Sequence, residues 1–413
     1  MSSAIVVGAT GILGREIVKE MGKEPAKWKT VHALSRSQKD SYPSNVVHHH
    51  INLLDSAADM AKSLKDVGAD YVFFAAYFQQ ESEEKEWEVN GDMLANFLGA
   101  LEISGAAGKI KRVVLVTGAK QYGVHLGQVK NPMIETDEWL RDSTWPPNFY
   151  YRQQDILKLF CEKHNNASWV VTYPNDVIGF AKGNYMNLAS SIGIYAAVSK
   201  ELGQDLVWPG SETFYTRFDS FTSSDLHARF CLWAASEPKA ANQAFNVVNG
   251  DVQSWQDLWP RVARRLGMKV KPDQFAGKSD LASTTPLDFP PPITLVAKEI
   301  GLEGKIGESE TAQRINLARW SQQDAVKQAW NRLAEREGLE KDAFEKATWA
   351  FLDFILGRNF DLVISMSKAR DMGWTGYQDI WKSFSDAFGE LEAANILPKV
   401  HWVGEPSGCT CLP

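Results

Sequence analysis

The chain has 413 residues, of which 44% are hydrophobic and 23% are charged, and its formal net charge is −7. This composition is typical of a globular protein with a large core, long enough for one large domain and a second lobe. The negative charge, without a clustered basic stripe, argues against nucleic acid and anionic membrane surfaces as partners.

Cysteine usage and the first residues bear on the cellular compartment. The four cysteines, Cys161, Cys231, Cys409 and Cys411, show no framework spacing, which favours a reducing compartment over secretion. The first three residues lead directly into AIVVGATG, which leaves no room for a removable leader. No apolar run approaches the roughly 20 residues of a membrane span. We therefore expect a cytoplasmic protein.

Short β-type runs alternate with helical segments through the first half of the chain. Apolar β runs occupy 4–8, 30–36, 46–54, 70–76, 112–118 and 168–174, and helical spacing occurs in 12–21, 55–64 and 86–97. This alternation predicts an α/β fold, a Rossmann-type doubly wound parallel sheet covered by helices. The predicted Rossmann domain spans 1–183, and a segment at about 236–268, which contains a strand-like run, returns to it.

The rest of the chain is expected to form a smaller, mostly helical substrate-binding lobe from 184–235 and 269–400. A proline-rich and polar stretch at 270–300 is typical of a long connection, and the apolar residues in 311–357 have helical spacing. Residues 401–413 are expected to form a flexible tail.

A glycine-rich turn, GATGILG, joins the first predicted strand to the first predicted helix. Glycines at Gly8, Gly11 and Gly14 allow the backbone to approach a pyrophosphate, which then lies at the positive end of the helix. The position between strand and helix is the one this motif requires. The turn therefore predicts a bound dinucleotide, with Thr10 and Ile12 also beside the phosphates.

The end of the second strand indicates which dinucleotide is preferred. An NAD site favours a carboxylate there, but this chain has Ser35 followed by Arg36. A guanidinium beside a hydroxyl suits the 2′-phosphate of NADPH, although Arg36 could equally be a solvated surface residue. Strand order assigns further cofactor contacts near the adenine and the nicotinamide ribose: Asn52, Leu53, Ala76 and Tyr77.

Two residues are candidates for the chemistry. Lys120 follows a strand in TGAKQYG, and Tyr150 opens a helix in NFYYRQQD. Reduction of a carbonyl or conjugated alkene needs a hydroxyl that binds the oxygen as charge develops, supported by an ammonium. Short-chain dehydrogenases usually carry both groups on one helix as Y-x-x-x-K, but Gln154 stands at the lysine position here. Because strand ends face the cofactor crevice, Lys120 can supply the ammonium from the strand side, with Tyr151 as the alternative hydroxyl.

These motifs resemble the progesterone 5β-reductase/iridoid synthase-like (PRISE) family of atypical extended short-chain dehydrogenases/reductases, which have lysine in TG-x-K-H-Y and tyrosine in N-F-Y-Y-x-x-E-D. The resemblance covers most of the chain, for example EVNGDMLANFL, TYPNDVIGF and SSDLHARFCLWAA. It implies NADPH-dependent reduction of activated C=C bonds in an enone or enal. It also implies that Lys120 and Tyr150 take the family's catalytic roles and contact the cofactor together with further residues: Thr117, Pro174, Asp176 and Val177.

The chain departs from the family pattern at four places. Gln121 stands where the family usually has histidine, Gln154 where it has glutamate, and Tyr77 where it commonly has tryptophan. The 270–330 stretch is longer than in plant members. The first two changes preserve shape, so reductase chemistry remains expected, whereas the last two alter the pocket and leave the substrate open.

The aromatic composition suits a terpenoid, steroid or other apolar secondary-metabolite substrate. The candidate substrate contacts are Tyr122, His125, Met186, Phe214 and Phe351. Each aromatic one could equally be a core residue, and a loop histidine is often incidental. The fifteen tryptophans admit the same two interpretations, cavity wall or core.

Alternative functions use the same fold. A cyclase or isomerase would bind NADP(H) without net reduction, and a carbonyl reductase or dehydrogenase would act on the oxygen-bearing carbon. A redox-sensing binding module would need neither Lys120 nor Tyr150. No metal is expected, because His48, His49 and His50 alternate between the faces of a strand. The expected partner is a small apolar enone, with no nucleic acid and no membrane, and nothing in the sequence excludes a homodimer.

Overall fold

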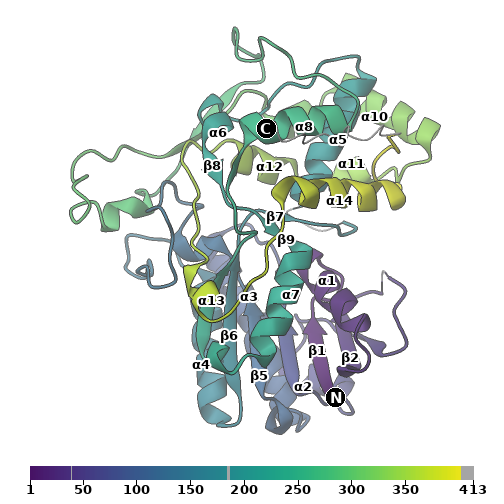
Figure 1. Ribbon diagram of the computed structural model, residues 1–413, viewed down its shortest axis with the longest axis vertical. Coiled ribbons are helices and arrows are strands. Elements are labelled where there is room, and N and C mark those ends of the chain that lie inside the picture. Colours follow the sequence, from purple (N-terminus) through teal and green to yellow (C-terminus); the bar gives the residue numbers. More distant parts are fainter. Residues whose placement is uncertain (39, 184–186, 401–413) are drawn as a thin grey trace, which may run out of the picture.

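A seven-stranded parallel sheet forms the centre of the larger domain in the computed structural model, which describes residues 1–38, 40–183 and 187–400 (Figure 1). The strand order is β10-β6-β5-β4-β1-β2-β3, and every neighbouring pair is parallel. The strands are β1 (Ser2–Val7), β2 (Trp28–Ser35), β3 (Val46–His50), β4 (Tyr71–Phe74), β5 (Arg112–Val116), β6 (Ser168–Pro174) and β10 (Gln243–Val247). The predicted doubly wound Rossmann sheet is confirmed.

Helices cover both faces of this sheet. The strand order reverses after β3, so right-handed crossovers place α1 on one face and α2 to α4 on the other. Helix α1 packs on α7, while α3 packs on α2 and α4. The helices of this domain are α1 (Ile12–Gly22), α2 (Ala57–Ser63), α3 (Glu83–Ile103), α4 (Phe149–Lys163), α7 (Ser224–Ser236) and α13 (Ser367–Asp371), with 3₁₀ turns η1 (Ala107–Lys109), η2 (Ala119–Tyr122) and η3 (Pro238–Ala240).

A second, mostly helical lobe lies above the carboxyl ends of the strands in Figure 1. Its helices are α5 (Leu188–Glu201), α6 (Glu212–Thr216), α8 (Trp255–Arg265), α9 (Leu317–Trp320), α10 (Asp324–Glu337), α11 (Ala343–Lys346), α12 (Trp349–Leu356) and α14 (Ile380–Ala393). Trp208, Trp255 and Trp259 are fully buried in its core. The ring of Trp208 lies 5.1 Å from that of Trp259 and 5.2 Å from that of Trp255, so these three tryptophans are core residues.

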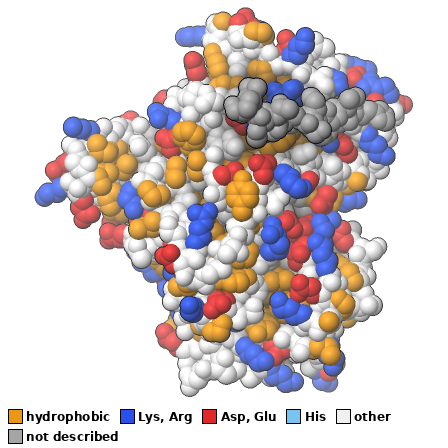
Figure 2. All heavy atoms as spheres, viewed as in Figure 1, with side chains coloured by type: hydrophobic (Ala, Val, Ile, Leu, Met, Phe, Trp, Pro, Cys, Tyr) orange, Lys and Arg blue, Asp and Glu red, His pale blue; other side chains and the backbone are white. Residues whose placement is uncertain are grey.

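Three short strand pairs connect the two parts and build a projecting arm. Strand β7 (Val177–Ile178) pairs with β9 (Thr222–Ser223), and β8 (Phe218–Asp219) with β11 (Gln253–Ser254). The arm consists of β12 (Ser283–Pro286) and the antiparallel β13 (Glu310–Gln313), joined by a long segment with the 3₁₀ turn η4 (Pro292–Leu295), and extends to the left in Figure 1. Figure 2 shows charged side chains of both signs interspersed over this face of the molecule.

The structure divides the chain differently from the sequence prediction. The sequence pattern places helix α7 in the lobe, but Leu226 and Phe230 on this helix lie in the same core as the sheet. The pattern places helix α8 in the returning Rossmann segment, but this helix lies in the core of the lobe. The chain crosses between the two cores several times, and periodicity alone does not indicate which core a helix joins. The predicted tail at 401–413 lies outside the described residues.

None of the described helices combines the length and the apolar character needed to cross a membrane.

Candidate active site

A cavity of about 990 Å³ lies at the carboxyl edge of the sheet, between the Rossmann domain and the lobe. It is the position at which open α/β sheets bind their ligands, where the strand order reverses. All sixteen residues predicted from the sequence to contact the cofactor line it: Gly8, Thr10, Gly11, Ile12, Ser35, Arg36, Asn52, Leu53, Ala76, Tyr77, Thr117, Lys120, Tyr150, Pro174, Asp176 and Val177. The folded chain thus brings together residues from six strand ends.

The glycine-rich turn at one end of the cavity has the shape that a pyrophosphate requires. Gly8 has φ of 80°, and a Cβ there would lie 2.6 Å from the carbonyl oxygen of Ala75. A Cβ on Gly14 would collide with the carbonyl of Gly8. Helix α1 begins at Ile12 with Gly11 as an N-cap that contributes no side-chain hydrogen bond. The positive end of α1 therefore borders the cavity, and these residues fit a dinucleotide.

The second strand ends beside the same cavity. Ser35 is buried, and its hydroxyl donates to the carbonyl of Ser37 at 2.9 Å and lies 2.9 Å from His48 Nε2. Arg36 is exposed, and its guanidinium lies 5.7 Å from the centre of the Phe78 ring. Among the described residues, no carboxylate forms an ion pair with Arg36. The guanidinium is accordingly available to an anionic group of a ligand.

One asparagine fixes both candidate catalytic residues. Asn148 caps helix α4, and its Oδ1 accepts the backbone N–H of Tyr150 at 3.0 Å. Its Nδ2 donates to the carbonyl of Lys120 at 2.8 Å. Lys120 lies in η2, directly after β5. The cap therefore ties the start of α4 to the turn after β5, and both side chains enter the cavity.

The Tyr150 hydroxyl is available for chemistry. A Cβ on Gly118 would lie 3.1 Å from this hydroxyl, so the missing side chain at Gly118 leaves room for it. Tyr150 Oη makes no hydrogen bond within the described part of the chain. Burial, with the negative charges of Glu86 and Glu83 as smaller causes, raises the pKa of Tyr150 above its ordinary value. The side chain is therefore a neutral donor that can reach a ligand in the cavity.

The neighbouring Tyr151 is a packing residue. Its hydroxyl donates to the carbonyl of Gln121 at 2.8 Å and accepts the N–H of Leu140 at 3.1 Å. Its ring stacks on Trp139 at 4.7 Å, and the residue is 5% exposed. Burial raises the pKa of Tyr151 to about 12. With donor and acceptor both used inside the protein, this hydroxyl has no role left in the cavity.

Two carboxylates from the first turn of α3 hold the Lys120 ammonium. Nζ lies 2.5 Å from Glu83 Oε2 and 2.8 Å from Glu86 Oε2, and the Tyr77 hydroxyl donates to Glu86 Oε1 at 2.6 Å. The acidic run at 81–88 leads into helix α3, and its exposed side chains are solvated. Glu83 and Glu86 instead point toward Lys120. In the sequence, these two acidic neighbours of Lys120 are indicated only by their i, i+3 spacing, which places both glutamates on one face of a helix.

Two of the predicted substrate contacts also line the cavity, His125 and Phe351. His125 Nε2 lies 3.8 Å from Glu83 Oε1. Burial, and secondly the charge of Lys120, lowers the pKa of His125 well below its ordinary value, so the ring is neutral at physiological pH. Its Nδ1 has no hydrogen-bond partner among the described residues.

Two other predicted substrate contacts lie elsewhere, and Met186 is outside the described residues. The Tyr122 side chain is buried behind the cavity wall, where its hydroxyl donates to Asn246 Oδ1 at 2.6 Å. Phe214 is fully buried in the core of the lobe. Both predictions are corrected by the structure, because the aromatic side chain in each case fills a core rather than the cavity.

The two glutamines that depart from the family pattern meet in the structure. Gln154 Nε2 donates to Gln121 Oε1 at 2.8 Å, and Gln154 Oε1 accepts the hydroxyl of Tyr173 at 2.9 Å. All three side chains are buried. A neutral amide pair satisfies its own hydrogen bonds without burying a charge, so the two departures form one structural unit behind the turn that carries Lys120.

A buried ion pair at the cavity wall joins residues that no motif in the sequence connects. Arg358, directly after α12, donates from Nη1 and Nη2 to the two carboxylate oxygens of Asp176 at 2.5 and 3.2 Å. Asp219 Oδ2 lies 3.8 Å from the same guanidinium, and burial, then the charge of Asp176, raises the pKa of Asp219. Asp176 has φ of 32°, a backbone conformation that few non-glycine residues adopt. The pair links a cofactor-side loop to the lobe, and no local sequence signal joins residues 182 positions apart.

The long connection after α8 forms part of the cavity wall. Leu287, Asp288 and Phe289 line the cavity, and Phe289 packs against a small apolar cluster that includes Tyr151. The backbone N–H of Ile293 donates to the carbonyl of Gln128 at 3.0 Å. The long connection therefore reaches back over the loop that follows Lys120.

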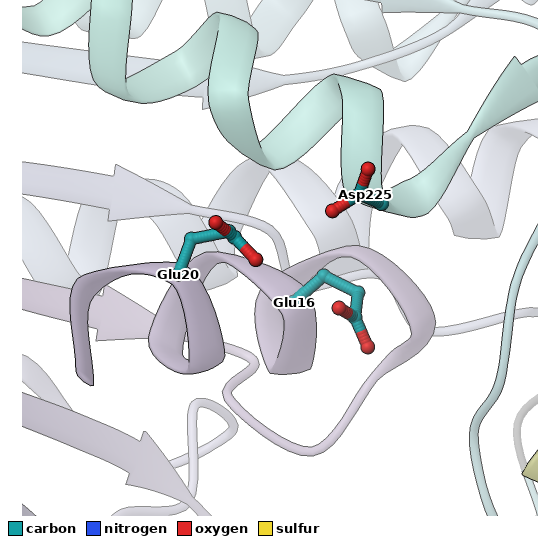
Figure 3. A group of neighbouring side chains, drawn as sticks. All are labelled: Glu16, Glu20 and Asp225. Carbon is teal, nitrogen blue, oxygen red and sulfur yellow. The ribbon is translucent and has the colours of Figure 1, made fainter. Parts of the chain in front are cut away.

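A separate acidic group lies between α1 and α7, where carboxylate oxygens of Glu16, Glu20 and Asp225 come within 4.8 Å of one another (Figure 3). Each carboxylate has a cationic partner. The partners are Arg15 at 2.6 Å and Lys19 at 3.1 Å for Glu16, Lys23 for Glu20, and Arg229 at 3.0 Å for Asp225. Ion pairing accounts for these carboxylates, and we infer no metal site from them.

The fold and the cavity together define a class. A doubly wound sheet with a glycine-rich turn, and with a lysine and a tyrosine at the carboxyl edge, is the architecture of oxidoreductases of the short-chain dehydrogenase type. Residues 4–286 match the family described as the PRISE-like Rossmann-fold domain. The chain belongs to this family.

Relatives extend the match to nearly the full chain. An uncharacterized protein of Schizosaccharomyces pombe is 43% identical over 403 residues, which is 96% of this chain and 98% of the relative. The 3-oxo-Delta(4,5)-steroid 5-beta-reductase of Arabidopsis thaliana is 28% identical and covers 96% of this chain and 93% of its own. The crystal structure of the Bordetella bronchiseptica enzyme WbmG in complex with NAD and UDP shares the fold, with a TM-score of 0.57 at 12% identity over 96% of each chain.

Proposed function

We propose that the protein is an NADPH-dependent reductase of activated C=C bonds in apolar enones or enals. The observation that carries the proposal is the Tyr150 hydroxyl, which has no hydrogen-bond partner among the described residues and lines the same cavity as the glycine-rich turn and Lys120. The similarity to a relative named as a steroid 5-beta-reductase supports the same reaction class.

In the proposed reaction the cofactor supplies the hydride, and residues of the chain bind the substrate and stabilise the developing charge. The glycine-rich turn and Arg36 would hold NADPH in the cavity, where the bound cofactor would supply the hydride for the β-carbon of the substrate. Tyr150 binds the carbonyl oxygen and donates a hydrogen bond as negative charge develops there. The Lys120 ammonium stabilises the enolate electrostatically, and a proton taken up from solvent at the α-carbon completes the saturated carbonyl compound. Phe351 and Phe354 shield this end of the cavity from water and pack against the apolar body of the substrate.

An assay with small enones tests the proposal. The purified protein is incubated with NADPH and an enone, NADPH absorbance is followed, and the product is identified. We expect consumption of one NADPH for each saturated ketone or aldehyde formed. An allylic alcohol as product would assign carbonyl reduction instead. Conversion without consumption of NADPH would contradict the proposal and indicate an isomerase or cyclase.

Arg36→Asp is expected to reverse the preference between the two nicotinamide cofactors. The substitution removes a guanidinium that no described carboxylate engages and puts a like charge where a 2′-phosphate would bind. A charge-assisted hydrogen bond contributes about 1.5–3 kcal/mol, so affinity for NADPH should fall by roughly 10- to 100-fold. Dissociation constants for NADPH and NADH, from quenching of tryptophan fluorescence, check this. Lys29→Asp makes the same change of charge at the other end of β2 and should leave the ratio unchanged; an equal effect of both variants would contradict the assignment.

A further inference from the structure

We propose that this site selects neutral or cationic apolar enones and discriminates against substrates that carry a carboxylate. The inference rests on the proposed function and adds a substrate class to it. It comes from the charges that line the substrate half of the cavity, which lies between Lys120 and α12.

Negative charge is in excess in this part of the cavity. Its described lining residues include four carboxylates, which belong to Glu83, Glu86, Asp176 and Asp288, and two cations, Lys120 and Arg358. The remaining cation of the cavity wall, Arg36, lies at the end of β2 beside the adenosine end of the dinucleotide site. The substrate half therefore carries two more negative than positive charges when all of its groups are ionised.

Both cations are already engaged by protein carboxylates. Lys120 lies between two glutamates, at 2.5 and 2.8 Å. Both terminal nitrogens of Arg358 donate to Asp176, and Asp219 Oδ2 lies 3.8 Å from Nη1 of the same guanidinium. A substrate carboxylate would have to displace one of these pairs and leave a partly buried carboxylate unpaired, which is costly.

Burial strengthens this repulsion. The side chains of Glu86 and Asp176 are only 4% and 5% exposed, so water screens their charges weakly. The lining of the cavity also includes the apolar side chains of Met93, Leu126 and Phe354. These side chains offer a carboxylate no donor, whereas a neutral ketone keeps its acceptor bond to Tyr150 and an ammonium group is attracted by the carboxylates.

The test compares an enone with a terminal carboxylate and the methyl ester of the same compound. Binding to the NADP⁺ complex is measured by calorimetry, which needs no turnover, and reduction is then measured with NADPH. We expect the ester to bind at least about tenfold more tightly than the acid, and its kcat/KM to be higher by a similar factor. Equal affinities would overturn the inference. If the ester bound more tightly than the acid but was not reduced, only the proposed function would be overturned.

Glu83→Gln should reduce the discrimination severalfold, because it removes one negative charge beside the ammonium. Glu84→Gln is the matched control, since Glu84 is exposed on the same helical turn. The ratio of ester to acid is the readout, so a general loss of activity does not affect it. An unchanged ratio in Glu83→Gln, with NADP⁺ binding retained, would contradict the role of this charge.

The same discrimination should weaken as the pH falls. Burial raises the pKa of Glu83 despite the opposing charge of Lys120, with Glu86 and Glu84 adding to the increase. The nearby His125 is neutral and adds no charge in this range. Protonation of Glu83 thus removes one negative charge at a higher pH than for an ordinary glutamate. The ester-to-acid ratio should fall toward the value of Glu83→Gln, and a ratio that rises on acidification would contradict the inference.

Discussion

Tyr150→Phe is expected to lose most turnover, by about 10²–10³ in kcat, the typical cost of removing one donor to a developing oxyanion. NADPH should still bind with a change in affinity of at most about tenfold, since one neutral hydrogen bond contributes about 0.5–1.5 kcal/mol. Stability should be almost unchanged, because the Tyr150 hydroxyl has no partner among the described residues. Single-turnover reduction of an enone, together with NADPH titration, measures both effects.

Tyr151→Phe is the matched control for this prediction, with the opposite signature. It leaves the buried N–H of Leu140 without its acceptor and the carbonyl of Gln121 without its donor. The expected cost is about 1–3 kcal/mol of the free energy of unfolding, with turnover per folded molecule retained. If Tyr151→Phe lost the turnover and Tyr150→Phe kept it, the chemistry would belong to the other tyrosine.

Arg358→Met is expected to destabilise the protein by roughly 3–5 kcal/mol, the usual effect of removing one partner of a buried ion pair. Arg358 has a side chain that is 3% exposed, and Asp176 and Asp219 would be left without their cation. Methionine retains much of the apolar volume beside Phe354, so the loss reports the charge rather than a cavity. Denaturant unfolding monitored by tryptophan fluorescence measures it.

The double variant Arg358→Met with Asp176→Asn should recover more than half of this loss. Asparagine removes one of the two uncompensated carboxylates, and burial already raises the pKa of Asp219 toward a neutral form. The loss in free energy of unfolding caused by Arg358→Met alone should also become smaller as the pH falls. A carboxyl group whose pKa is raised in the folded state is more compatible with folding when protonated, so its destabilising effect grows as the pH rises. A deficit independent of both changes would show that Arg358 acts through packing alone.

Much of the fold followed from local pattern. The β runs alternating with helical spacing predicted the parallel sheet, and GATGILG marked the dinucleotide end of it, because the strand-turn-helix context leaves few alternatives. The assignment of the helices to the two hydrophobic cores did not follow from the local pattern. Helices α7 and α8 are near each other in the chain and both carry buried apolar side chains, yet one packs on the sheet and the other in the lobe.

The candidate site shows the same division between local and long-range information. The motifs marked Lys120 and Tyr150, and the resemblance to the PRISE family identified the class of protein. The adjacent tyrosines could not be separated by sequence, because both are aromatic residues at a helix start. Only the hydrogen-bond partners of each hydroxyl distinguish a residue in the cavity from one in the core.

The sequence by itself determined the class of protein, the dinucleotide turn and the two residues proposed for catalysis, because each depends on groups that are close together in the chain. The tertiary structure decided the electrostatic character of the substrate half of the cavity. Glu83 and Glu86 reach Lys120, Arg358 reaches Asp176, and Asp288 enters the wall from the arm, all across long separations in sequence. Coulomb interactions depend on distance in space and on burial, and both are fixed only when the two cores pack together.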